Sequence, residues 1–461
     1  MIRFIPALAL LVAAPAAAQQ LSTTEVAAVD KLVAKTLADT GVPSAEIAVV
    51  RNGQLVLNKA YGKANEGLPA RADLPYQIAS NSKQFTAMAL LLLRDEGKLS
   101  MDDNVAKYLP GISGGDRITI RQLLSHTSGL QDFWPQDYMF SEMTLPTTPQ
   151  YIVDKWAKKP LDFEPGTRWQ YSNTGYVVAG MIAEKVSGEP LFAYLDRKVF
   201  KPLGMRPINQ DDANTPAFPA GYHRAALGPV RIAAPPGRGW LYAAGELALT
   251  AEDLAKWDVA RLNRSLIPAR DWIEQETPVL RSDGRTNGYG LGVYTRYTRQ
   301  RHIIDHGGEA VGFLTQNTVY PDTKDAIVVF TNADFSGASD SLTAGLENLL
   351  LNSPDAKLTG EGDRLADVKA LYASLTKGRV NRAKLTSHLN EYFDATVVGD
   401  YRKSLAALGT PKIEALGPPR LRGGFVNRNF AIRYPKETLT LITYAEPGAN
   451  GRFEQFLVMP E

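Results

Sequence analysis

One stretch constrains this chain more than any other, the segment YQIASNSKQFTAMALLLLR at residues 76–94. It places Ser80 and Lys83 three residues apart at the start of a strongly apolar run. Residues three apart on a helix share a face, with Cβ atoms about 5–6 Å apart. A serine hydroxyl is a weak nucleophile that needs a neighbouring base, and a desolvated lysine can serve as that base. The spacing therefore predicts a nucleophile and its base at the N-terminal end of a central, buried helix.

The Ser-x-x-Lys spacing alone is a weak signal, because the chain contains it twice. The second copy, Ser374 to Lys377, lies at the polar end of a helical stretch and runs directly into Gly378. A glycine at that place ends a helix and leaves the pair near solvent. We interpret this second copy as a chance match.

Two other candidate nucleophile or base positions carry less weight. Ser113 lies in Gly-Ile-Ser-Gly-Gly at residues 111–115, which matches the Gly-x-Ser-x-Gly nucleophile elbow. That elbow must follow a buried strand and open a helix, whereas here polar residues follow it, so we interpret it as a loop. His126, in the turn at residues 125–129, is a candidate catalytic histidine. The alternative is that His126 only holds the backbone of that turn.

Composition narrows the chemistry. The chain has no cysteine, and its five histidines are scattered without metal-ligand spacing, so we expect no metal, no disulfide and no cofactor. The net charge of +2 gives no reason to expect nucleic acid or an acidic membrane surface as a partner.

The first 18 residues have the composition of a secretory signal. Arg3 supplies a positive charge, residues 4–14 form an apolar run, and three alanines at 16–18 precede Gln19. The apolar run is shorter than the ~20 residues of a membrane-spanning helix. We therefore expect a signal peptide over residues 1–18, cleaved after Ala18, and a periplasmic or secreted protein without a stable membrane anchor.

The length of 461 residues indicates two or three domains. A polar segment, NSPDAKLTGEGD, suggests a boundary at residues 352–363. We expect a main domain over residues 19–352, a linker over 353–363 and a small α+β domain over 364–461. The small domain's expected order is three helices followed by three strands, at Leu365–Leu375, Arg382–Phe393, Ala395–Leu408, Phe425–Tyr434, Thr438–Tyr444 and Arg452–Met459.

The main domain mixes helices with antiparallel strands. A helical pattern over Leu21–Gly41, which Thr23 can cap, precedes two β-type runs around Asn52-Gly53, a strong hairpin signal. Strand patterns return at residues 288–294, 302–304, 312–320 and 326–331, and a closing helix is expected over 335–351. The fold class expected is α/β (α+β), with an antiparallel sheet flanked by helices.

Three further segments leave their alternatives open. Tyr171-Ser-Asn173 precedes a buried helix, where a tyrosine and an amide can face Ser80, but Ser172 or Asn173 can equally cap that helix. The segment His306-Gly307-Gly308-Glu309 lies among the strands, and its glycines permit close approach of a ligand or form a plain turn. Aromatic residues in the loop at 133–147, together with Trp240 and Tyr242, either line a pocket or pack locally.

Taken together and in order, the segments SNSK (80–83), YSN (171–173) and HGG (306–308) resemble those of the serine β-lactamase and penicillin-binding protein superfamily, specifically its class C-like branch. The stretches SHTSGL (125–130), EPGTRWQYSN (164–173) and AAGELALTAEDLAKW (243–257) resemble the same family. The resemblance covers about residues 21–352. It implies an antiparallel sheet flanked by helices, an all-helical region, and a site between them.

The resemblance also implies roles. Ser80 would be the acylated nucleophile, Lys83 its base, and Tyr171 the relay that carries the proton to the leaving group. Asn173 would bind the substrate's amide, and the N–H groups of Ser80 and Glu309 would form the oxyanion hole. Which of Lys83 and Tyr171 takes the first proton stays open at this point.

One departure from the family pattern bears on the substrate. β-Lactamases and penicillin-binding proteins generally carry Lys-Thr-Gly or Lys-Ser-Gly where this chain has His306-Gly307-Gly308. A largely neutral histidine offers less fixed charge to a substrate carboxylate. We therefore expect an exported serine hydrolase that acts on a small ester, amide or peptide, as a carboxylesterase or D-amino-acid peptidase does. The alternatives are a class C-type β-lactamase and a catalytically silent scaffold. The small domain is a little like an NTF2-like domain, and the oligomeric state stays open.

Overall fold

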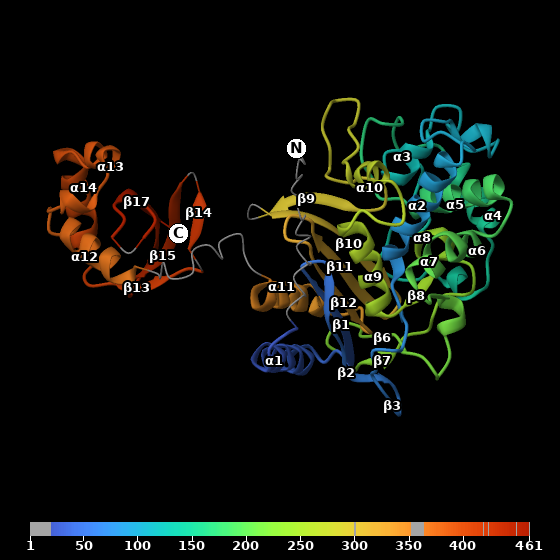
Figure 1. The fold of residues 1–461 in the computed structure, drawn as a ribbon, viewed down its shortest axis with the longest axis horizontal. Coiled ribbons are helices and arrows are strands. Elements are labelled where there is room, and N and C mark those ends of the chain that lie inside the picture. The colour runs from blue at the N-terminus through green and yellow to red at the C-terminus, as the bar shows by residue number, and fades with distance from the viewer. Residues whose placement is uncertain are drawn as a thin grey trace, which may run out of the picture. The chain divides into compact units, whose positions relative to one another are not determined.

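The structure, a computed structural model, describes residues 20–298, 301–351 and 364–460 apart from 418, 423 and 449. It divides into two compact units between Leu351 and Asn352 (Figure 1). The expected signal segment 1–18 and linker 353–363 lie outside the described residues. Within the described part of the chain, no helix combines the length and apolar character needed to span a membrane.

A seven-stranded antiparallel sheet forms the centre of the first unit. Its strand order is β3-β2-β1-β12-β11-β10-β9. The earliest long strand, β1, pairs with the last one, β12, in a register that places Ala45 opposite Thr331 and Val50 opposite Ala326. The expected antiparallel α/β fold is confirmed. The strands are β1 (Ser44–Arg51), β2 (Gln54–Asn65), β3 (Leu68–Pro69), β9 (Tyr294–Thr298), β10 (Arg301–Ala310), β11 (Phe313–Tyr320) and β12 (Asp325–Thr331).

The two faces of this sheet are covered differently (Figure 1). Helices α1 (Thr23–Thr40) and α11 (Ala338–Leu350) pack together on one face, where Val29, Val33 and Leu346 meet the inward residues of β1 and β12. Helix α9 (Ala251–Leu262) packs on the other face, and beyond it lies a helical region around α2 (Lys83–Asp95). The largest hydrophobic cluster joins that region to the sheet, so the first unit has a helical layer on each side of its strands.

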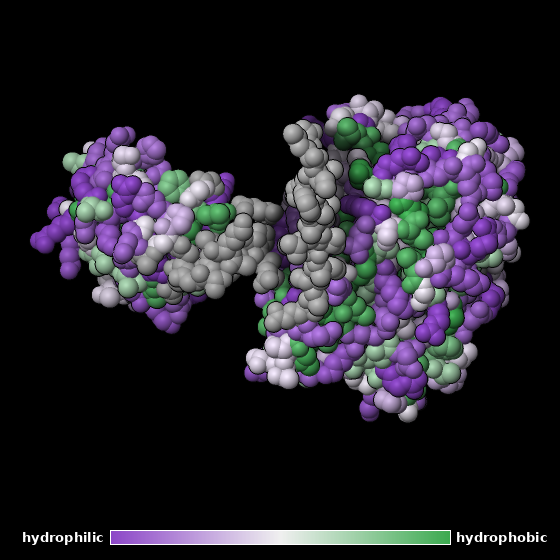
Figure 2. Space-filling model, in the orientation of Figure 1, coloured by the Kyte–Doolittle hydropathy of each residue, from purple (hydrophilic) through white to green (hydrophobic). Residues whose placement is uncertain are grey.

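Helix α2 is the most deeply buried element of the helical region. Ten of its thirteen residues are buried, among them Phe85, Met88 and Leu90, which have no exposed surface. A fully buried side chain of this size contributes about 1.5–3 kcal/mol. The helix is therefore fixed firmly, as its apolar sequence predicts. Figure 2 shows hydrophobic side chains gathered over the region where α2 and α8 lie in Figure 1.

The remaining elements of the first unit are short, apart from the 15-residue α5 and the 8-residue α10. The helices are α3 (Ile120–Leu124), α4 (Pro149–Ile152), α5 (Asn173–Ser187), α6 (Leu191–Leu195), α7 (Lys201–Leu203), α8 (Tyr242–Gly245) and α10 (Ala269–Glu276). Two small sheets complete the unit: β4 (Tyr76–Gln77), β8 (Leu247–Leu249) and β5 (Ile208–Asn209) in one, β6 (Tyr222–His223) and β7 (Arg231–Ile232) in the other.

Several local predictions need correction. Helix α1 is capped by Ser22 and not by Thr23, because Ser22 and Glu25 form a capping box. Residues 288–293 form no strand. In this segment Gly292 has a φ of +82°, and a Cβ there would lie 2.8 Å from the carbonyl oxygen of Lys83. The segment crosses the start of α2 at a distance that only glycine permits, and strand β9 begins after it.

The second unit is a small α+β structure. Three helices precede a sheet of order β13-β15-β16-β17, with β14 beside β15. The single helix expected over residues 382–393 is wrong: a short 3₁₀ turn at Arg382–Lys384 comes first, and Thr386 then caps a separate α13. The elements are α12 (Leu365–Leu375), α13 (Ser387–Tyr392), α14 (Ala395–Ala406), β13 (Lys412–Ala415), β14 (Arg420–Arg422), β15 (Phe425–Arg433), β16 (Thr438–Ala445) and β17 (Phe453–Pro460).

Candidate active site

Ser80 lies in a tight 3₁₀ turn, Ala79–Ser82, which leads directly into α2. Ala79 adopts a φ of +47°, a conformation that costs a non-glycine residue about 1–3 kcal/mol and persists only where the surroundings enforce it. The surroundings do so here. The side-chain Nδ2 of Asn81 donates to Thr315 Oγ1 on β11 at 3.0 Å, and Ser82 Oγ accepts from the Leu247 backbone N–H at 3.2 Å. The turn is thereby tied to both neighbouring sheets.

Lys83 points from the first turn of α2 back to Ser80. Its Nζ lies 2.8 Å from Ser80 Oγ and donates to Asn173 Oδ1 at 2.8 Å and to the Ala244 carbonyl at 2.7 Å. The side chain is completely buried. Burial lowers the pKa of Lys83 to about 7, although the Asp132 carboxylate acts in the opposite direction. A substantial fraction of the amine is therefore neutral at neutral pH, as a general base requires.

Tyr171 approaches Ser80 from the loop before α5. Its hydroxyl donates to Ser80 Oγ at 2.8 Å. Burial raises the pKa of Tyr171 well above its usual value, and the hydrogen bond to Ser80 offsets this only in part. The phenol thus stays protonated at neutral pH. The alternative left open for this segment also holds, because Ser172 caps α5 by accepting from the Gly175 N–H at 3.2 Å.

Asn173, the first residue of α5, is held by Asp132, which the sequence alone did not single out. Asp132 Oδ2 accepts from Asn173 Nδ2 at 3.2 Å, and Asp132 Oδ1 accepts from the Asn173 backbone N–H at 3.0 Å and the Trp134 N–H at 3.2 Å. The carboxylate follows the SHTSGL stretch by two residues. The residues around Asp132 indicate only a loop. The contact between Asp132 and Asn173 could therefore not be predicted from the local sequence.

His306 lies on β10 with both ring nitrogens engaged. Its Nδ1 contacts the Gly307 carbonyl oxygen at 2.5 Å, and its Nε2 lies 2.9 Å from the Tyr289 hydroxyl. A carbonyl only accepts, so Nδ1 carries the proton and Nε2 accepts from Tyr289. Burial, together with the charge of Lys83, lowers the pKa of His306 to about 3. His306 is therefore a neutral residue and no substitute for a lysine.

Gly308 explains why glycine stands on this strand. A Cβ at Gly308 would lie 2.1 Å from the Ile78 carbonyl oxygen and 2.3 Å from Thr315 Oγ1. Strand β10 pairs with β11 without a register shift, so the glycines form neither a bulge nor a turn. The atoms that require a glycine at position 308 thus belong to the protein itself, at Ile78 and Thr315. Close approach of a ligand was one of the two explanations expected from the sequence.

His126 does not contact Ser80 through any hydrogen bond. Its Nδ1 accepts from the Ser172 N–H at 3.1 Å, and its ring packs on Tyr171 with centroids 4.2 Å apart. The His126 ring therefore supports the backbone of the Tyr171 loop, whereas the expected alternative to a catalytic role was support of its own turn at 125–129. Ser113 lies in a surface turn, and its backbone N–H donates to the Ala157 carbonyl.

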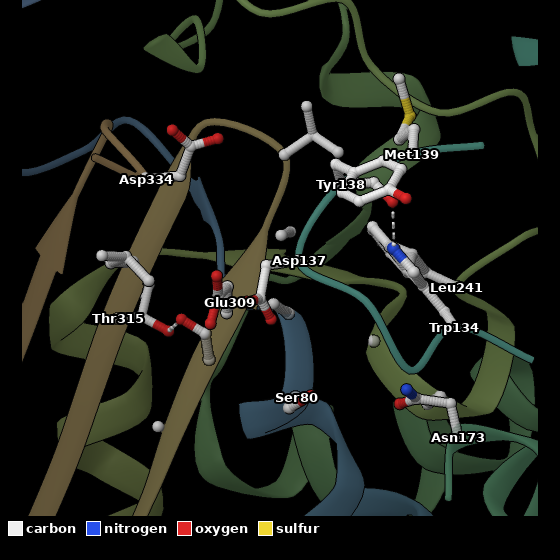
Figure 3. A pocket seen from close by; sticks show the side chains of 18 of the residues that line it. Ser80, Trp134, Asp137, Tyr138, Met139, Asn173, Leu241, Glu309, Thr315 and Asp334 are labelled. Atoms are coloured by element: carbon white, nitrogen blue, oxygen red, sulfur yellow. Dashed lines mark hydrogen bonds between the residues drawn. The ribbon is translucent and has the colours of Figure 1, made fainter. Parts of the chain in front are cut away.

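A cavity of about 960 Å³ opens above Ser80, close to the upper end of the range usual for small-molecule sites. Ser80, Tyr171, Asn173 and residues 306–309 all line it. Figure 3 shows Trp134, Tyr138, Met139 and Leu241 on one side, and on the other the strand residues Glu309 and Thr315 with Asp334 from the loop after β12. Of the loop aromatics, Trp134 and Tyr138 line the pocket, whereas Phe133 and Phe140 pack on Trp240, which is 1% exposed.

Negative charge dominates the polar part of this cavity. Five carboxylates line it, from Asp132, Asp137, Glu309, Asp334 and Asp340. Among the described lining residues, Arg231 is the lone arginine or lysine. Partial burial and the neighbouring charges of Asp137 and Asp334 raise the pKa of Glu309. Within the described residues, no group of three or more potential ligands is placed to hold a metal ion.

Comparisons with known proteins agree with this geometry. Residues 29–351 match the Beta-lactamase family. Protein flp of Staphylococcus aureus (strain N315) is 28% identical over 319 residues, and the match covers 66% of this chain and 62% of that protein's length. A D-stereospecific amidohydrolase from Streptomyces sp. superposes with a TM-score of 0.61 at 30% identity, covering 71% of this chain and 99% of its own.

A D-amino acid amidase from Ochrobactrum anthropi SV3, in complex with L-phenylalanine amide, superposes with the same TM-score of 0.61 at 25% identity. It covers 71% of this chain and 98% of its own. The arrangement of Ser80, Lys83 and Tyr171 lies inside the matched region. This chain belongs to the Beta-lactamase family.

Proposed function

We propose that this protein hydrolyses small esters or amides through an acyl-enzyme formed on Ser80. The observation that carries the proposal is the position of Ser80 Oγ, 2.8 Å from both Lys83 Nζ and the Tyr171 hydroxyl at the floor of the cavity. A nucleophile within hydrogen-bond reach of a base that is itself held by further groups is the arrangement expected for covalent catalysis.

Lys83 is the better candidate for the first proton. Its pKa of about 7 leaves a neutral fraction at neutral pH, whereas the raised pKa of Tyr171 keeps the phenol protonated. In acylation, the Ser80 proton passes to Lys83 Nζ as Oγ bonds to the substrate's carbonyl carbon. The leaving group then takes a proton from Tyr171, which regains one from Lys83. Attack by water with the same proton transfers in reverse returns the free serine.

The polar lining supports substrates that carry an amine or no charge on the acyl side. His306, which stands where β-lactamases generally carry a lysine, is neutral, and five carboxylates line the cavity. A substrate carboxylate would meet repulsion there, whereas a protonated amine would be attracted. The amidohydrolase and amidase neighbours, at 30% and 25% identity, add support for D-amino-acid amides as one substrate class. A class C-type β-lactamase activity is the less favoured alternative, because β-lactams carry a carboxylate.

A matched substrate panel tests this function. The purified protein is incubated with p-nitrophenyl butyrate, D-phenylalanine amide, N-acetyl-D-phenylalanine amide and a chromogenic cephalosporin, and the adduct on Ser80 is sought by mass spectrometry. We expect turnover of the ester or the free-amine amide, and a lower kcat/KM for the acetylated amide. Absence of turnover and of any adduct with all four compounds would refute the proposal.

We also propose that the protein is exported, because residues 1–18 have the composition of a signal peptide. Expression of the full chain in a Gram-negative host, followed by N-terminal sequencing of the protein in the periplasmic fraction, tests this. We expect the mature chain to begin at Gln19. An intact Met1 in the cytoplasmic fraction would contradict it.

A further inference from the structure

We propose that Asp132 is a positioning residue that fixes the direction of the Asn173 amide, so that the lone pair of Lys83 points at Ser80. The proposal rests on the acyl-enzyme function proposed above, because it assigns a purpose to the group that orients the base. Asp132 does not contact Ser80 or Lys83 through any hydrogen bond that the structure shows. It acts through Asn173.

The contacts of Asp132 determine which end of the Asn173 amide faces Lys83. An ionised carboxylate only accepts hydrogen bonds, so the Asn173 atom 3.2 Å from Asp132 Oδ2 must be the NH₂ nitrogen. The amide oxygen is then turned to Lys83 Nζ, 2.8 Å away. The second contact, from the Asn173 backbone N–H to Asp132 Oδ1, fixes the start of α5 relative to the loop.

The direction of the Asn173 amide matters because it determines where the hydrogens and the lone pair of Lys83 point. A neutral lysine amine has two hydrogens and one lone pair. Two of its three neighbours, Asn173 Oδ1 and the Ala244 carbonyl, only accept, so they take the two hydrogens. The lone pair is left for the third neighbour, Ser80 Oγ, whose proton it can take. The neutral base is thus aimed at the nucleophile by its two acceptors.

Reversal of the amide would undo that aim. With the NH₂ group of Asn173 facing Lys83, the amide would donate to the lone pair of the neutral amine. The lone pair would then be occupied, and Ser80 would lose its acceptor. Nothing else in contact with Asn173 Nδ2 distinguishes the two directions as firmly as a carboxylate does, which makes Asp132 the residue that sets the geometry of the base.

The charge of Asp132 also matters for the protonation of Lys83. The other titratable side chains near Lys83 are Tyr171 and Tyr176, whose rings lie 4.8 and 5.4 Å from Nζ, and the neutral histidines His126 and His306. None of these four carries a charge at neutral pH. Asp132 is accordingly the negative charge that holds the pKa of Lys83 up against burial.

The test is the Asp132→Asn variant, which is almost isosteric. Its Oδ1 can still accept from the N–H groups of Asn173 and Trp134, so the fold should be retained, as a melting curve checks. Its NH₂ group, however, faces the NH₂ group of Asn173 and drives the amide to reverse. We expect acylation to slow by roughly 10- to 1000-fold, which is less than the upper end of the ~10²–10⁴-fold that a positioned base contributes. The acid limb of the pH–rate profile should move to lower pH, because a negative charge near Lys83 is lost.

An exchange variant, Asp132→Asn with Asn173→Asp, provides the rescue. A carboxylate at 173 presents an oxygen to Lys83 in either direction, and its second oxygen can accept from the new NH₂ group at 132. With a p-nitrophenyl ester, which has no amide for residue 173 to bind, we expect most of the acylation rate to return. The acid limb should move to higher pH than in the wild type, since the charge now lies beside Lys83. A merely structural role for Asp132 predicts no such pair of opposite shifts.

Asp162→Asn serves as the matched control. Asp162 is an exposed carboxylate that accepts from Gln170, the residue before Tyr171, so the variant makes the same charge change near the same loop. It should acylate at the wild-type rate. An Asp132→Asn variant that acylates as fast as the wild type with an unshifted profile would overturn the proposal, as would an exchange variant no faster than Asp132→Asn. Absence of acylation in the wild type itself would instead refute the proposed function.

Discussion

The two Ser-x-x-Lys copies in this chain share a spacing and little else. Lys83 is fully buried, contacts three acceptors or partners, and faces Ser80 across 2.8 Å. Lys377 is exposed, follows the end of α12, and its backbone N–H bonds to the Ser374 carbonyl. The Ser374 hydroxyl itself donates to the Arg379 carbonyl at 2.9 Å. The second pair thus completes a helix end, whereas the first is arranged for chemistry.

The difference shows what the spacing needs in order to act. A lysine in water is almost always protonated at neutral pH, and its ammonium group cannot accept a proton. Burial removes that preference at Lys83, and acceptors on Asn173 and Ala244 decide where the amine points. Neither the burial of the lysine nor the position of its acceptors can be inferred from the four-residue Ser-x-x-Lys motif. Both come from segments far along the chain.

The largest expected effect separates the two serines. Ser80→Ala removes the nucleophile, so we expect no adduct and a fall in kcat/KM of roughly 10³- to 10⁶-fold. Ser374→Ala, the matched control, should leave both unchanged. Intact-protein mass spectrometry after incubation with a p-nitrophenyl ester checks the first point, and steady-state kinetics the second. An unchanged cellular phenotype for Ser80→Ala would favour the scaffold alternative.

The next effect separates the two lysines. Lys83→Arg keeps a positive charge but replaces a base with a group that does not deprotonate in proteins. We expect acylation to slow by about 10²- to 10⁴-fold, as measured by the pre-steady-state burst. Lys377→Arg changes an exposed residue and should stay within about twofold of the wild type. Equal effects of the two substitutions would remove the basis of the comparison.

The pH dependence of acylation should report Lys83. Below its pKa of about 7 the base is protonated, so kcat/KM for a neutral ester should fall about tenfold for each pH unit on the acid side. The wild type and Lys377→Arg should share this limb. An acid limb between pH 4 and 5 would indicate a carboxylate as the base and contradict the assignment.

The smallest effect concerns the glycines that accompany each pair. Gly308→Ala would force a Cβ against the Ile78 carbonyl oxygen and Thr315, so we expect a loss of about 1–3 kcal/mol of stability in the first unit. Gly378, with a φ of +68° after Lys377, should cost about 1 kcal/mol on substitution by alanine.

These two losses can be measured separately. All six tryptophans lie between residues 134 and 272, so tryptophan fluorescence in urea follows the first unit alone. Circular dichroism in the same titration includes the second. A Gly308→Ala variant with unchanged fluorescence transition would show that the backbone can relax around the new methyl group.

Sequence predicts the parts of this molecule that depend on near neighbours. The closeness of Ser80 to Lys83 and the Asn52-Gly53 hairpin each follow from residues within one turn of one another. Their structural form matches the expectation. The catalytic roles of Ser80, Lys83 and Tyr171 stay predictions until they are tested.

Contacts between distant segments account for what the sequence did not predict. Asp132 meets Asn173 across 41 residues, and nothing local distinguishes it from other loop aspartates. Residues 288–293 have a strand-like pattern, yet they cross the start of α2 and form no strand. Strand β14 was missed because it lies among the glycines and prolines of LGPPRLRGG at residues 416–424, and β13 because it is only four residues long. Both strands pair with β15.

The pairing of β1 with β12 has a consequence for how the chain acquires its activity. Ala45 and Thr331 are partners although 286 residues separate them, so the sheet cannot close until nearly the whole first unit has been synthesised. Such long-range pairing slows folding, because a large loop must be ordered before its contacts form. Ser80 lies near the start of the first unit, whereas strands β10 and β11, which contact its turn, lie near the end of that unit. The rate at which Ser80 becomes reactive toward a covalent label would therefore report the rate at which the first unit completes its folding.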